Sequence, residues 1–137
     1  MKTLKLSAMF LMALFVFSCT GTTEHNEHSD DSPLELDNGQ KWKVNAEMIP
    51  YILDGEKMLN EYDGSDYKQL AEQLKDKNNG LIKSCTMTGK SHDELHKWLY
   101  PHIELITALG DAESEQKATA IIEQLKESFN TYNAHFQ

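Results

Sequence analysis

The chain has 137 residues, with 13 lysines, no arginine and 22 acidic residues, which gives a formal net charge of −9 at pH 7. An acidic chain without arginine is a poor candidate for binding nucleic acid, because arginine is the preferred residue for bidentate recognition of phosphates and bases. Its length is enough for one domain and excludes two.

The N-terminal residues 1–18 read as a lipoprotein signal peptide. Two lysines precede an apolar run from Leu6 to Phe17, which is too short for a comfortable membrane span. The sequence Val-Phe-Ser-Cys ending at Cys19 is similar to a lipobox, in which the cysteine is lipidated and becomes the new N-terminus. An ordinary secretory peptide with an incidental cysteine is the alternative. We expect Cys19 to anchor the protein to a bacterial membrane in the cell envelope, facing the periplasm or the outer surface.

A polar stretch follows and then four helical segments. Residues 19–40 have no apolar period and predict a flexible tether, with a helical domain over 41–137. Apolar residues at helical spacing predict helices over about 44–62, 66–87, 91–110 and 112–132, the first of which Asn45 can cap. Asn78-Asn79-Gly80 predicts an interruption of the second helix, and Ser91 with Glu94 predicts a capping box for the third. Short connections favour an all-α, antiparallel up-down-up-down four-helix bundle.

Residues 85–102 hold the pattern most suggestive of chemistry. Cys85 and Met87 are expected at the end of the second helix, and His92 and His96 at the start of the third. A spacing of four residues turns both imidazoles to one face, and the turn brings the sulfur side chains to the same end of the bundle. Thiolate, thioether and imidazole together suit copper best and zinc second. We therefore expect a metal site of these four residues.

Other interpretations of the same residues remain open. Cys85 continues a leucine stripe and is also consistent with core packing, while Met87 is consistent with filling a gap. His102 is either an additional metal ligand or a buried histidine bonded to a neighbouring helix. With a methionine across the bundle it is also a candidate axial ligand for non-covalent haem. Cys85 is a poor nucleophile at a helix C-terminus, so an enzyme is not expected.

The segment Cys-Thr-Met-Thr-Gly-Lys-Ser-His-Asp-Glu-Leu-His-Lys-Trp-Leu, residues 85–99, resembles a motif of small uncharacterised lipoproteins of Gram-negative bacteria. Lys41-Trp-Lys-Val-Asn45 fits the same group, and the resemblance covers most of residues 40–137. It implies a compact helical domain behind a lipid anchor. The expected architecture is also similar to that of four-helix periplasmic cytochromes, although the chain lacks a Cys-x-x-Cys-His motif for covalent haem.

These patterns predict an envelope lipoprotein that binds a transition metal for sequestration, tolerance or delivery. The alternative is a helical module without a cofactor that binds an envelope protein partner.

Overall fold

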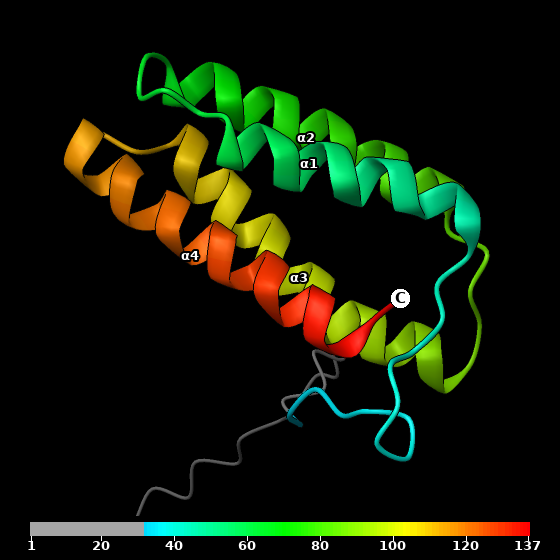
Figure 1. Cartoon of the computed structure of the whole chain (residues 1–137). Helices are drawn as coiled ribbons and strands as arrows, with labels where there is room; N and C mark the ends of the chain where they lie inside the picture. Colours follow the sequence, from blue (N-terminus) through cyan, green and yellow to red (C-terminus); the bar gives the residue numbers. More distant parts are fainter. Residues whose placement is uncertain (1–31) are drawn as a thin grey trace, which may run out of the picture.

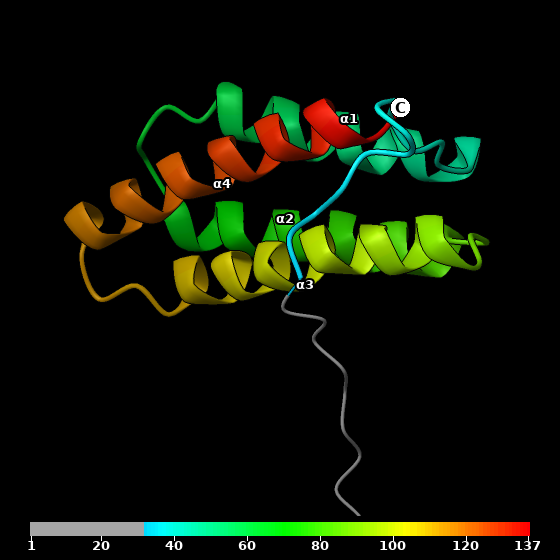
Figure 2. The same cartoon turned by 90° about the horizontal axis from the view of Figure 1, so that it is seen from below.

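The computed structural model describes residues 32–137, which form four α-helices preceded by a short 3-10 helix. The 3-10 helix η1 spans Ala46–Met48, and the α-helices are α1 (Ile49–Asn60), α2 (Tyr67–Ser84), α3 (Lys90–Gly110) and α4 (Glu115–His135). Each α-helix packs against the next along the chain, and α1 also contacts α4, less extensively (Figures 1 and 2). The expected all-α class and helix-bundle packing are therefore confirmed for this part of the chain.

The core lies along the centre of the bundle, where each α-helix contributes one apolar stripe. The stripes follow from apolar residues that recur at helical spacing in the sequence. The most deeply buried large side chains are Met48, Leu59, Leu74, Leu81, Leu95, Leu109, Leu125 and His102. Among residues 32–137, no helix is both long enough and apolar enough to cross a membrane.

Helix boundaries differ from the expected ones in two instructive places. α2 continues without a break through Asn78, Asn79 and Gly80, where an interruption was expected. The absence of a side chain at Gly80 leaves room for the ring of Tyr51 on α1, so this glycine serves helix packing. α2 then ends at Ser84, and Cys85 adopts an extended backbone, so Cys85 and Met87 lie beyond the helix.

The segment that precedes the helices, residues 33–44, is here called the strap. The Glu35 amide donates to the Glu94 carboxylate on α3 at 2.8 Å, and the Trp42 indole donates to the Glu35 carbonyl at 2.6 Å. Trp42 pairs its backbone with the end of α4, through a bond to the His135 carbonyl at 2.7 Å and one from Gln137 at 2.9 Å. Figure 2 shows this segment passing from α3 to the C-terminal end of α4. Leu34 and Glu35, assigned above to the tether, therefore contact the bundle, whereas residues 36–40 are exposed and contain a turn closed by bonds between Asp37 and Gln40.

The expected signal peptide, the lipidation site at Cys19 and the rest of the tether lie outside the described residues.

Candidate metal centre

Three ring side chains, those of His92, His96 and Tyr100, contact one another in series along α3. The ring centroids of His92 and His96 are 4.1 Å apart, and those of His96 and Tyr100 are 4.9 Å apart. Residues four apart on a helix share one face, so the spacing in the sequence produces this series. Both imidazoles are half-buried, whereas Tyr100 is 42% exposed. The prediction that His92 and His96 face the same way is confirmed.

The start of α3 positions the first imidazole by backbone geometry. Gly89 has φ 68° and ψ −154°, a conformation that residues with a Cβ rarely adopt. Its carbonyl accepts from the amides of His92 and Asp93 at 3.0 and 3.1 Å, which starts the helix. The predicted capping box is wrong: the Ser91 hydroxyl donates to the Thr88 carbonyl instead, and the Glu94 carboxylate is held by other partners.

The surroundings of His96 favour its neutral form. Burial lowers the pKa of His96 below its usual range, and the neighbouring His92 lowers it further, while Asp93 acts in the opposite direction. A neutral imidazole keeps a bare ring nitrogen, which is the form that binds a metal ion. The lowered pKa therefore increases the fraction of His96 that is neutral.

The two sulfur residues lie on the connection between α2 and α3, residues 85–89. Cys85 carries a free thiol, and both Cys85 and Met87 are half-buried against the core. The side chain of Asn45 fixes the backbone on either side of Cys85, because it donates to the Ser84 carbonyl at 2.8 Å and accepts from the Thr86 amide at 3.0 Å. Asn45 was expected to cap the first helix, but its side chain makes no capping bond.

The structure brings together only part of the predicted ligand set. Among the histidine, cysteine, aspartate and glutamate side chains of residues 32–137, no group of three or more is arranged to hold a metal ion. The two imidazoles are adjacent, and the sulfur residues lie on the connection that leads directly into their helix. The structure therefore places the two imidazoles side by side and leaves both sulfur residues on the connection that precedes them.

His102 is a core residue bonded to the neighbouring helix, as one of the three interpretations predicted. It is 1% exposed, and its Nδ1 atom lies 2.8 Å from the hydroxyl of Ser128 on α4. Its ring stacks on Trp98 at 4.7 Å and meets the edge of Phe129 at 4.7 Å. Burial lowers the pKa of His102 to about 4, so the ring is neutral at physiological pH. These contacts give His102 a structural role in the core.

α3 also carries a buried ion pair, Glu94 with Lys97, that no pattern in the sequence predicted. The Glu94 carboxylate is 2.9 Å from Lys97 Nζ, and the two side chains are only 3% and 9% exposed. Burial by itself would raise the pKa of Glu94, but hydrogen bonds from the Glu35 amide and Lys97, with the charges of Lys97 and Lys90, outweigh it and lower this pKa. The i, i+3 spacing in the sequence allowed the pair, but nothing local indicated that the strap would bury it.

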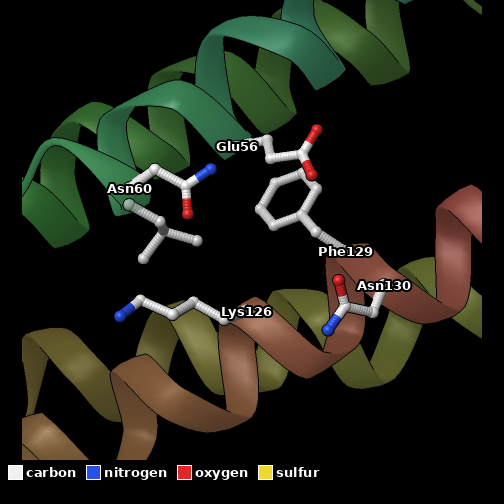
Figure 3. Close-up of a pocket in the computed structure, with 6 residues that line it drawn as sticks. Glu56, Asn60, Lys126, Phe129 and Asn130 are labelled. Carbon is white, nitrogen blue, oxygen red and sulfur yellow. The ribbon is translucent and has the colours of Figure 1, made fainter.

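A small polar cleft opens between α1 and α4 (Figure 3). Its volume is about 110 Å³, and its lining consists of Glu56, Leu59, Asn60, Lys126, Phe129 and Asn130. Beside it, the Asn133 side chain donates to the Glu56 carboxylate at 2.9 Å and bridges the two helices. Pockets for drug-sized ligands and cofactors are about three times larger or more, so this cleft does not fit a haem group.

Comparison with models of protein families, with curated proteins and with solved structures finds no match for this chain.

Proposed function

We propose that the protein is an envelope lipoprotein, attached to a membrane through Cys19, that binds a transition metal on α3 without catalysing a reaction. The observation that carries the proposal is the 4.1 Å separation of the His92 and His96 rings on one face of a helix. Copper is the favoured metal and zinc the second choice. The role would be sequestration, tolerance or delivery.

Two imidazoles from adjacent turns of one helix need little rearrangement to bind a metal ion together, because the helix has already fixed their backbone positions. The lowered pKa of His96 supports the same role, since the proton does not compete with the metal at neutral pH. Cys85 and Met87 would add the soft ligands that favour copper. Cys85 and Met87 precede His92 by seven and five residues and lie on the connection to which the Asn45 side chain is hydrogen-bonded.

We further infer that the four helices run antiparallel, up-down-up-down. Their connections are the short segments 61–66, 85–89 and 111–114, and short connections join antiparallel neighbours in helix bundles. In this topology the 85–89 connection and the first turns of α3 occupy one end of the bundle, as a site of mixed sulfur and nitrogen ligands requires.

The test is a titration of the full chain, solubilised in detergent with Cys85 reduced, against Cu(I), Cu(II) and Zn(II) in competition with a chelator of known affinity. His92→Gln with His96→Gln should abolish one-to-one binding. The matched control is His25→Gln with His28→Gln, which removes two imidazoles from the polar N-terminal stretch and should leave binding unchanged. Binding lost only in the control, or no binding tighter than micromolar for any of the three ions, would contradict the proposal.

A helical interaction module without a cofactor is the second candidate, favoured by the exposed apolar residues on α1. Ile49 and Leu53 are 37% and 57% exposed and lie on the side of α1 that also carries Glu56, a residue bonded to α4. Photo-crosslinking from position 53 on the intact envelope should then give one discrete adduct, which Leu53→Lys weakens. No specific observation favours non-covalent haem binding, because the His102 ring already contacts the Ser128 hydroxyl and the Trp98 ring.

A further inference from the structure

The dipeptide Asn-Gly occurs twice in the sequence, at residues 38–39 on the strap and at residues 79–80 on α2. In this dipeptide the backbone nitrogen of glycine can attack the side-chain carbonyl carbon of asparagine, because glycine has no Cβ to obstruct the approach. The backbone has to leave any regular hydrogen-bonded conformation before the two atoms can meet. The two copies therefore expose the same chemistry to two different backbone environments.

The copy on the strap lies in an exposed turn. Asn38 and Gly39 have φ of 51° and 85°, and a Cβ at Gly39 would meet no heavy atom within 4 Å beyond its chain neighbours. The turn is closed by the bonds between the Asp37 amide and the Gln40 carbonyl, at 2.8 Å, and between the Gln40 amide and the Asp37 carbonyl, at 2.9 Å. The Asn38 side chain donates to the adjacent Asp37 carboxylate at 3.0 Å, also in an exposed position. Such a turn opens at a small cost in free energy.

The copy on α2 is held by the helix. The Asn79 side chain is exposed, as that of Asn38 is, so access of water does not distinguish the two sites. The Gly80 backbone lies inside the continuous helix Tyr67–Ser84, where its amide donates along the helix. Gly80 also packs against the ring of Tyr51 on α1. Opening of the backbone here breaks several helix bonds together and disturbs the contact of α1 with α2, so it costs more free energy than opening of the turn.

We propose that Asn38 is a site of spontaneous deamidation, and that the fold protects Asn79 from the same reaction. Hydroxide removes the amide proton of Gly39, and the nitrogen forms a bond to Cγ of Asn38. The bond between Cγ and Nδ2 breaks, and ammonia leaves after it takes a proton from water. A water molecule then opens the five-membered imide at either of its carbonyl groups. In sum, asparagine and water give ammonia and either aspartate or isoaspartate, with no oxidation or reduction.

The modification changes the strap at a position between its contacts with the bundle. Both products add a negative charge beside Asp37. Isoaspartate also carries the main chain through the former side-chain carbon, which lengthens it by one atom, so it no longer fits the turn that Asp37 and Gln40 close. This turn separates Glu35 from Trp42, whose indole donates to the Glu35 carbonyl at 2.6 Å. The site therefore lies where the N-terminal stretch joins the helical domain.

The test is incubation of the full, metal-free chain in detergent at mildly alkaline pH, followed by digestion at acidic pH and mass spectrometry that separates aspartate from isoaspartate. In the folded chain Asn38 should convert at least about tenfold faster than Asn79. The matched control is the chain unfolded in guanidinium chloride, in which the two identical dipeptides should convert at similar rates. An unmodified Asn38 under conditions in which the unfolded chain reacts, or equal rates at the two sites of the folded chain, would overturn the proposal.

Asn38→Gln is the matched variant. Its side chain is longer by one methylene group, so attack by the Gly39 nitrogen would form a six-membered ring, which closes far more slowly. The product on the strap should disappear, while the slow conversion of Asn79 and the helical content measured by circular dichroism should be unchanged. Release of ammonia from the strap at an unchanged rate in this variant would overturn the assignment of Asn38 as the reacting residue.

Discussion

Gly80 on α2 packs directly against the aromatic ring of Tyr51 on α1. A Cβ atom at position 80 would lie within 3.0 Å of three ring carbon atoms of Tyr51, closer than real Cβ contacts allow. The glycine therefore lets the two helices meet around a large side chain, and α2 stays helical through it despite the low helix propensity of glycine.

Gly80→Ala should destabilise the domain by about 1 kcal/mol, because the overpacking cost of about 1 to 3 kcal/mol exceeds the gain in helix propensity of about 1 kcal/mol. Urea unfolding followed by circular dichroism measures the change. Asn79→Ala, at the exposed neighbouring position, controls for propensity alone and should be neutral or slightly stabilising. In a Tyr51→Ala background the sign should reverse; an equally destabilising Gly80→Ala there would contradict the contact as the cause.

The buried His102 should make stability depend on pH in the mildly acidic range. Its pKa is about 4 in the folded chain and about 6.5 when unfolded, so the unfolded state binds the extra proton first as pH falls. The contribution of His102 is fully present above about pH 6.5 and is lost as pH falls toward 4, by up to about 3 kcal/mol. Urea unfolding between pH 7 and 4 measures it. His102→Gln should flatten this dependence, and a slope that persists in that variant would assign it to other groups.

The Glu94 carboxylate bonds both to the strap, through the Glu35 amide, and to Lys97 on its own helix. Glu94→Gln removes the charge that Lys97 contacts at 2.9 Å and weakens the bond to the Glu35 amide, so we expect a loss of about 2 kcal/mol in unfolding free energy. Hydrogen exchange at the Glu35 amide should accelerate. Because the pKa of Glu94 is lowered in the folded chain, its contribution is present at neutral pH and disappears as pH falls through that pKa.

The control for the Glu94 prediction is Glu123→Gln. Glu123 pairs with Lys126 at the same i, i+3 spacing and 2.8 Å, but the side chains are 65% and 39% exposed. Water screens such pairs, so this substitution should change stability by less than about 1 kcal/mol. Similar losses in the two variants would contradict the role of burial.

Asn45 should control the mobility of the connection that carries Cys85. Asn45→Ala removes both side-chain bonds to this connection, and we expect a loss of about 1 to 2 kcal/mol together with faster thiol labelling of Cys85. The labelling rate with a thiol reagent under native conditions measures the effect. Asn133→Ala, which removes the exposed bond to Glu56, is the control and should leave the labelling rate unchanged.

Local sequence signals predicted the parts of the molecule that local physics determines. The period of the apolar residues predicted four helices, and the four-residue spacing of His92 and His96 predicted that their rings share one face of a helix. The places that were predicted incorrectly depend on partners distant in the sequence. Gly80 was interpreted as a break because its neighbour Tyr51 is 29 residues away, and Glu94 was assigned to a cap because its partner Glu35 is 59 residues away. No pattern within one helix specifies such contacts.

The backbone pairing of Trp42 with His135 and Gln137 has a consequence for the kinetics of folding. The packing of each helix on the next closes only short stretches of chain, whereas this pairing joins the two ends of the domain and must overcome the entropy of closing nearly its whole length. It should therefore form after the rate-limiting step. Weakening this pairing should raise the unfolding rate in stopped-flow measurements and leave the folding rate nearly unchanged. The contact between the two ends therefore sets how long the folded state persists.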